Sequence, residues 1–364
     1  MIAEFEIPCD GPQEDVRLTF MEEPLGIAAS HGYGKATQLN RENKLRELEV
    51  LQRLSSPPGS YPKHCVRLDE HFYQPGVDAA DGEHLCMAME LMCSSVSSIR
   101  HDKADIFIPV SVVKRMLRHL LSGIADIHSR GIAHTDIKPD NIMIDLGSSW
   151  TTESIDAWLK DNPAQAFPPT QSLYKMVTGY VSQSFPHPPL DTLNSHTYKL
   201  ADFGSAQFVS DQMTDDITPL GLRPPEIILG GEWNESVDIW TFGCVAFNLL
   251  TGTPLFNPLT IMNQSREDTV LYQMICFCGE FFHEKYLGRC SRSTQYFDYD
   301  CRPKPEENKK FFRKTFQECI LSAKFPIAPE DVEGAAALMA RALRLDPRDR
   351  PTAQELLEDP WLAS

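Results

Sequence analysis

The residues best suited to chemistry lie in one polar stretch, 134–141, which reads His-Thr-Asp-Ile-Lys-Pro-Asp-Asn. Phosphoryl transfer to a hydroxyl needs a carboxylate that accepts or orients the hydroxyl proton and an oxygen ligand for Mg²⁺. Asp136 and Asn141 supply these two groups, and Lys138 can place a positive charge near the transferring phosphoryl. The pattern predicts a phosphoryl-transfer loop; the alternative is a polar loop after a helix that matches by chance.

A second carboxylate for the same chemistry is Asp202, in the triplet Asp-Phe-Gly after a strand-like stretch at 198–200. A carboxylate there can bridge Mg²⁺ to nucleotide phosphates. The separation of Asn141 and Asp202 exceeds a short hairpin. We attribute the excess to an insertion over residues 146–198, which is rich in Pro, Ser, Thr and Gln and has little periodicity.

Two further motifs follow at the expected places. Arg223-Pro-Pro-Glu226 stands where a segment after Asp-Phe-Gly should end, and Asp349-Arg350-Pro351 lies near the C-terminus. A buried Glu226 without a cationic partner would be costly, so we predict a buried ion pair between Glu226 and Arg350.

The periodicity of the chain predicts the elements that position these residues. The first ninety residues contain short strand-like segments and one amphipathic helix near 40–54, where Leu45, Leu48 and Leu51 recur at helical spacing. From residue 112 onward an apolar stripe indicates a long helix, and 237–250 is apolar on nearly all sides, as in a buried helix. We expect a small mixed lobe followed by a larger helical one.

With these motifs in order, the chain resembles a eukaryotic protein kinase from about Leu45 to Leu362, and within that group the SR-protein kinase (SRPK) branch, particularly its fungal relatives. The resemblance rests on the segments 134–141, 201–206, 222–230, 236–244 and 250–256. It implies an α+β bilobal kinase fold: a reduced, incomplete N-lobe over 1–89, a hinge at 90–92 and a mainly helical C-lobe over 93–364. The insertion at 146–198 and a second surface insertion at 290–309 belong to that C-lobe.

The resemblance also implies roles for individual residues. Asp136 is the catalytic base, Lys138 stabilises the phosphoryl group, and Asn141 and Asp202 hold Mg²⁺. The cofactors are then ATP and Mg²⁺.

The nucleotide site should draw on three more residues. Glu47 lies on the amphipathic helix, where kinases place the glutamate that pairs with the phosphate-binding lysine. Met89 would guard the back of the adenine pocket, and backbone groups from Glu90 to Met92 would hydrogen-bond the adenine edge.

The upper half of the nucleotide site departs from the kinase pattern. The best strand match, Val16–Phe20, places Thr19 where the lysine belongs, and Lys35 and Lys44 are the nearest alternatives. His31-Gly-Tyr-Gly-Lys35 resembles a glycine-loop fragment, but we interpret it as a turn. The small lobe is therefore either reduced or an incomplete version of a longer one.

Thr135 replaces the arginine that, in most kinases, binds a phosphorylated activation loop. Without a guanidinium, a phosphate on that loop would lose its usual partner, so we expect a kinase that needs no activation-loop phosphorylation. The alternative is a tolerated substitution without regulatory meaning.

Composition narrows the class of partner. A net charge of -17 argues against direct nucleic-acid binding and fits a basic peptide, although acidity also simply keeps proteins in solution. No run of about 18 apolar residues and no signal-peptide layout appear, so we expect a protein of the cytoplasm and/or nucleus with no membrane association. We also expect a monomer. The ten cysteines are scattered, which favours ordinary reduced thiols.

Two functions fit these observations. The first is a serine/threonine protein kinase that acts on basic, Arg-Ser-rich protein segments. The second is a catalytically impaired pseudokinase that keeps the fold as a protein-binding scaffold.

Overall fold

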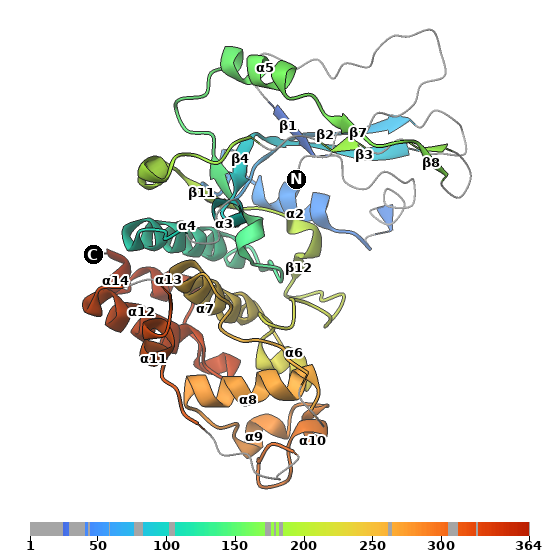
Figure 1. The fold of residues 1–364 in the computed structure, drawn as a ribbon. Coiled ribbons are helices and arrows are strands. Elements are labelled where there is room, and N and C mark those ends of the chain that lie inside the picture. Colours follow the sequence, from blue (N-terminus) through green and yellow to red (C-terminus); the bar gives the residue numbers. More distant parts are fainter. Residues whose placement is uncertain are drawn as a thin grey trace. The chain divides into compact units, whose positions relative to one another are not determined.

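The structure is a computed structural model (Figure 1). It describes residues 25–28, 41–42, 44–57, 59–75, 83–101, 106–171, 176–177, 180–181, 185–260, 264–304, 312–324 and 327–363. The chain divides into two compact units, a strand-rich unit (Met1–Ser95 and Met143–Gly204) and a helical unit (Val96–Ile142 and Ser205–Ser364). This is the mixed α+β architecture that the sequence predicts.

The strand-rich unit contains two three-stranded sheets. In the first, β3 (Glu83–Glu90) pairs antiparallel with β1 (Leu25–Ala28) on one edge and with β2 (Leu68–Pro75) on the other. In the second, β6 (Ile142–Asp145) lies between β4 (Met92–Ser95) and β11 (Tyr198–Leu200). The strand predicted at 16–20 lies outside the described residues, and β1 is a strand that the sequence analysis missed.

Helix α2 (Glu47–Leu54) is the amphipathic helix of the strand-rich unit. Leu48, Leu51 and Leu54 are buried, as their helical spacing predicts, whereas Leu45 precedes the helix and is exposed. Acidic residues in its first turn and Arg53 in its last turn complement the helix dipole. The helix therefore begins seven residues later than predicted, at Glu47.

Residues 146–198, predicted as an insertion in the C-lobe, group with the strand-rich unit, because the strands that flank them share one sheet with β4. They contain α5, a short 3-10 helix and two small ladders. The elements are α5 (Thr152–Asp161), β7 (Gln165–Ala166), β8 (Thr170–Gln171), β9 (Met176–Val177), β10 (Tyr180–Val181) and the 3-10 helix Leu190–Ser195. The exact lobe boundaries stay a prediction.

The helical unit is organised around α7 (Ser236–Thr251), which packs against α4 (Val110–His128) and α12 (Pro329–Ala342). Nearly every side chain of α7 is buried. A methyl group added at Gly243 would lie 2.6 Å from Leu343, so the close approach requires glycine there. No helix in the described ranges is long and apolar enough to cross a membrane.

This unit also contains short helices and strands and the longer helix α8 (Figure 1). They are α3 (Ser98–His101), β5 (Ile132–Ala133), the 3-10 helix Pro139–Asn141, β12 (Gln207–Phe208), α6 (Pro225–Leu229), α8 (Arg266–Cys278), α9 (Glu284–Leu287), α10 (Ser293–Tyr296), α11 (Phe316–Leu321), α13 (Ala353–Leu357) and α14 (Pro360–Ala363).

Candidate active site

The backbone of the loop that carries Asp136 is hydrogen-bonded to Asp238, a fully buried residue of α7. One carboxylate oxygen accepts the backbone N–H of His134 at 2.7 Å and lies 2.9 Å from His128 Nε2. The other accepts the N–H of Thr135 at 2.9 Å. Burying a carboxylate costs free energy unless it is hydrogen-bonded. These contacts therefore satisfy the Asp238 carboxylate and fix the loop that follows β5.

Asp136, Lys138 and Asn141 lie together in the helical unit, as the sequence predicts. Lys138 Nζ contacts Asp136 Oδ2 at 2.6 Å, and Asn141 Nδ2 donates to the same oxygen at 3.0 Å and to the Asp136 carbonyl at 2.9 Å. Asp136 Oδ1 makes no hydrogen bond with a described residue, so one oxygen of an oriented carboxylate is free to accept a proton. The catalytic role of the three residues stays a prediction.

Asp202 and Glu47 lie together in the strand-rich unit. Gly204 N donates to Asp202 Oδ1 at 3.3 Å. A methyl group added at Gly204 would lie 3.2 Å from that oxygen and 3.8 Å from Glu47 Oε2, so both carboxylates face the same glycine. Burial, and secondarily the charge of Asp202, raises the pKa of Glu47 to about 7.

Glu47 makes no ion pair with any described residue, although kinases normally pair this glutamate with a lysine. Strand β1, which pairs with β3, reads Leu-Gly-Ile-Ala and contains no lysine. Lys44 is exposed and contacts Glu42 at 2.7 Å instead. The other candidates, Thr19 and Lys35, lie outside the described residues.

Glu47, which has no ionic partner among the described residues, should make stability depend on pH. The pKa of its carboxyl rises from 4.5 to about 7 on folding, so ionisation costs nothing below pH 4.5, and the cost grows up to pH 7 and then stays constant. We expect Glu47→Gln to raise the free energy of unfolding by up to about 3 kcal/mol at pH 8 and much less at pH 5. Urea unfolding at both pH values measures this.

The matched control for that prediction is Glu49→Gln, which removes an exposed carboxyl two residues along the same helix. It should change stability little at either pH. A Glu47→Gln effect of equal size at pH 5 and pH 8 would show that ionisation of Glu47 does not cause it.

The predicted hinge residues lie at the junction of β3 and β4. Glu90 ends β3, and its N–H donates to the Arg67 carbonyl at 2.9 Å. Its carboxylate accepts the Arg67 N–H at 2.7 Å and contacts Lys199 Nζ at 2.6 Å. Met92 begins β4 and is buried. Contact between this junction and adenine stays a prediction.

Two neutral side chains, Thr135 and Gln207, hold part of the segment after Asp-Phe-Gly. Thr135, in the left-handed region at φ 66°, donates its hydroxyl to the Ser205 carbonyl at 2.7 Å. The amide oxygen of Gln207 accepts the N–H groups of Met213 and Thr214 at 2.6 and 3.2 Å, and its nitrogen donates to the Thr214 carbonyl at 3.1 Å. An uncharged glutamine thus provides ordering contacts within this segment. Nothing in the sequence around Gln207 predicts this role.

A family model described as "Protein kinase domain" matches residues 31–157 and 190–362. The chain belongs to the protein kinase family. The match passes over 158–189, within the part of the kinase chain that the sequence predicts as an insertion.

Several curated kinases are similar along most of this kinase. The serine/threonine-protein kinase SRPK of Physarum polycephalum is 27% identical, with 90% of this chain and 78% of the relative covered. The protein kinase dsk1 of Schizosaccharomyces pombe is 24% identical, with coverages of 88% and 73%. The dual specificity protein kinase lkh1 of the same yeast is 26% identical, with coverages of 88% and 41%. These relatives include a kinase named SRPK, the branch that the motifs resemble.

The predicted ion pair between Glu226 and Arg350 is present in the helical unit of this kinase. Arg350 donates to both carboxylate oxygens at 2.6 and 2.7 Å, and both side chains are 0% exposed. The guanidinium also donates to the carbonyls of Arg344 and Ser236. The pair ties the end of the activation segment, at α6, to α7 and the C-terminal helices.

Removing one partner would leave a buried charge unpaired. We expect Arg350→Leu to lower the free energy of unfolding by about 3–5 kcal/mol. Denaturant unfolding of the two proteins measures this, and Arg348→Leu is the control, because Arg348 is exposed and pairs with Asp346 at the surface. Equal stability of Arg350→Leu and the parent protein would show that the pair is dispensable.

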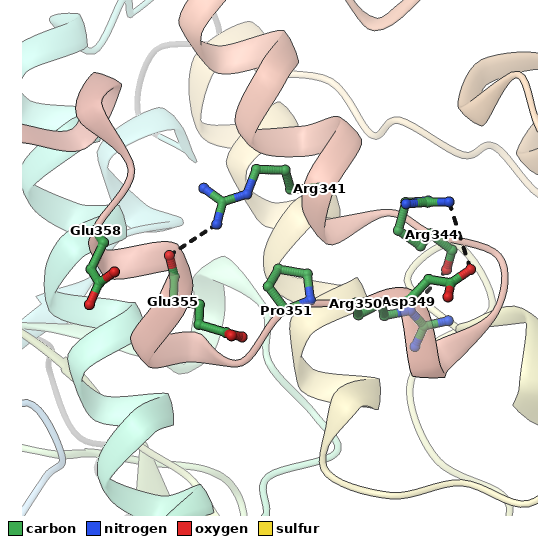
Figure 2. Close-up of a pocket in the computed structure, with 7 residues that line it drawn as sticks. All are labelled: Arg341, Arg344, Asp349, Arg350, Pro351, Glu355 and Glu358. Carbon is green, nitrogen blue, oxygen red and sulfur yellow. Dashed lines mark hydrogen bonds and ion pairs between the residues drawn. The ribbon is translucent and has the colours of Figure 1, made fainter.

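Arg350 of this ion pair also lines a hollow of about 470 Å³ (Figure 2). Ligand pockets are usually lined mainly by apolar side chains, whereas this one is lined almost entirely by charged side chains, of which Arg344 pairs with Asp349. Its residues are Arg341, Arg344, Asp349, Arg350, Pro351, Glu355 and Glu358. We assign it no part in the reaction.

Proposed function

We propose that the chain transfers the γ-phosphoryl group of ATP to serine and threonine hydroxyls in basic, Arg-Ser-type protein segments. The observation that carries this proposal is the orientation of Asp136, whose Oδ2 is held by Lys138 and Asn141 while its Oδ1 stays free of described partners. A carboxylate in that state can accept the proton of an incoming hydroxyl. Lys138 then lies where developing negative charge on the phosphoryl oxygens needs a cation.

ATP and a divalent metal are the general cofactors of this family, and we propose Mg²⁺ as the metal. Both hydrogen bonds of Asn141 to Asp136 use its amide nitrogen, which leaves the amide oxygen available as a ligand. Asp202 accepts one hydrogen bond from a described residue, the N–H of Gly204. Carboxylate and amide oxygens are hard ligands that suit Mg²⁺, which neutralises phosphate charge when bound.

The substrate class rests on charge and on kinship. The chain carries 51 acidic against 34 basic residues, which favours a basic peptide partner. Similarity to a kinase named SRPK along 90% of the chain favours segments that combine arginine with serine. Both point to basic serine-containing peptides as the acceptor.

The test is single-turnover transfer from radiolabelled ATP and Mg²⁺ to an Arg-Ser repeat peptide. A Glu-Ser peptide of equal length is the control for charge. We expect transfer to the Arg-Ser peptide and little to the acidic one. Equal transfer to both peptides would contradict the substrate class, and no transfer to either would contradict the kinase proposal.

A scaffold without turnover is the second candidate, favoured by one observation. Among described residues Glu47 has no cationic partner, and β1 contains no lysine. Such a site would position the phosphates poorly. A thermal melt with Mg²⁺ and millimolar ATP separates the two functions, because a protein that binds the nucleotide is stabilised by it and a scaffold that does not bind it is unchanged.

A further inference from the structure

One ion pair in the strand-rich unit spans two parts of the predicted nucleotide site. Lys199 Nζ contacts both carboxylate oxygens of Glu90, at 2.7 and 2.6 Å. The two side chains are 17% and 15% exposed, so the pair is largely shielded from water. Glu90 Oε1 also accepts the N–H of Arg67. One carboxylate therefore joins the end of β3, the approach to β2 and the middle of β11.

Lys199 reaches this carboxylate because side chains alternate along a strand. Its neighbours Tyr198 and Leu200 are buried, and Lys199 lies on the other face of β11. The backbone of β11 is fixed beside residues 64–66, since Leu200 N donates to the His64 carbonyl and Val66 N to the Leu200 carbonyl, both at 2.8 Å. The ammonium group adds a contact from β11 to the last residue of β3.

The two ends of this contact adjoin residues with predicted roles. Glu90 opens the segment whose backbone is proposed to bind the adenine edge, and Lys199 lies three positions before Asp202, the proposed metal ligand. We infer that Lys199 and Glu90 are a positioning pair, which sets the separation between the adenine-binding segment and the metal ligand of the same nucleotide. This inference rests on the proposed function.

Glu47 has no ionic partner in the described part of the chain, which increases the importance of the Lys199–Glu90 pair. In other kinases a lysine on a strand of the N-lobe sheet pairs with the helix glutamate and contacts the phosphates. Among the residues that the structure describes, Glu47 has no such partner. Lys199 and Glu90 supply a largely buried charge contact between the two ends of the site. Such positioning matters, because displacing a reacting group by about 1 Å can lower the reaction rate about 10²-fold.

Isothermal titration of the whole chain with Mg-ATP and with adenosine tests the inference. Lys199→Met removes the ammonium group and keeps an unbranched side chain. We expect its Kd for Mg-ATP to rise about tenfold, whereas its Kd for adenosine, which lacks phosphates, changes less than about twofold. Glu90→Gln should behave in the same way. The double variant should be no weaker than either single variant, because both remove one interaction.

A matched control separates positioning from stability. Arg67→Gln breaks the ion pair of Arg67 with Asp69 in the same unit and leaves the backbone N–H that Glu90 accepts. It should leave the Kd for Mg-ATP unchanged. Lys199→Arg keeps the positive charge and should recover most of the affinity that Lys199→Met loses.

The outcomes are distinguishable. A Lys199→Met protein that melts at a lower temperature but binds Mg-ATP as tightly as the parent would overturn the inference, because the pair would then be structural only. A parent protein that binds no Mg-ATP would overturn the proposed function, and the inference with it.

Discussion

Asp136→Asn is expected to lower the rate of phosphoryl transfer about 10²–10⁴-fold while the fold and nucleotide affinity stay close to those of the parent. The amide keeps the size and shape of the carboxylate, but it cannot accept the hydroxyl proton. Because Lys138 and Asn141 both contact the same oxygen of Asp136, the variant can still accept their hydrogen bonds through its amide oxygen. The loss should therefore fall on the chemical step.

Single-turnover transfer to the Arg-Ser peptide measures that step, and titration with Mg-ATP reports binding separately. The control is Asp140→Asn, which removes the charge of a neighbouring carboxylate. That carboxylate accepts a hydrogen bond from Ser97, and among the described contacts it has no ion pair with Lys138 and no hydrogen bond with Asn141. It should leave the transfer rate within a few-fold of the parent. Full-rate transfer by Asp136→Asn would remove Asp136 from the mechanism.

The lower half of the site could be predicted from sequence because its residues are close together along the chain. Asp136, Lys138 and Asn141 lie within six positions, so their types and spacing already fix which groups can meet. Glu226 and Arg350 are 124 positions apart, yet each stands in a short recognisable motif. The prediction succeeded there because burial of one charge requires the other.

The contacts that the sequence analysis missed join residues without a motif. Lys199 and Glu90 are 109 positions apart, and neither residue type is unusual at its place. Gln207 contacts residues six and seven positions ahead, but a glutamine in a loop has no spacing rule that predicts such contacts. Only the folded path of the backbone brings these groups together.

The described residues of the insertion at 146–198 make contacts that its composition does not predict. Thr151 caps α5: its hydroxyl oxygen accepts the N–H of Ser154, and the hydroxyl oxygen of Ser154 accepts the N–H of Thr151. This is a capping box, which the sequence Thr-x-x-Ser indicates only weakly. The ring of Phe185 stacks on that of Trp158, with 4.4 Å between the ring centroids, and contacts the Trp150 ring edge to face, with centroids 4.9 Å apart. These aromatic residues are too far apart in sequence to show a helical or strand period.

Asp202→Asn should give the second large effect, with two consequences of opposite sign. Loss of a ligand's negative charge should weaken the Mg²⁺-dependent part of nucleotide binding by at least about tenfold, or about 1.4 kcal/mol. The same change removes the charge that helps to raise the pKa of Glu47, so the protein without nucleotide should be as stable as the parent or slightly more stable above pH 7.

Thermal melts with and without Mg-ATP at pH 8, together with nucleotide titrations at several Mg²⁺ concentrations, separate these two consequences of Asp202→Asn. Asp145→Asn is the control, because Asp145 belongs to the same unit but pairs with His196. It should keep the Mg²⁺ dependence of binding. An Asp202→Asn protein whose nucleotide affinity responds to Mg²⁺ as the parent's does would show that Asp202 is not a metal ligand. A fall in stability without nucleotide would show instead that its negative charge supports the fold, since repulsion from Glu47 predicts the opposite sign.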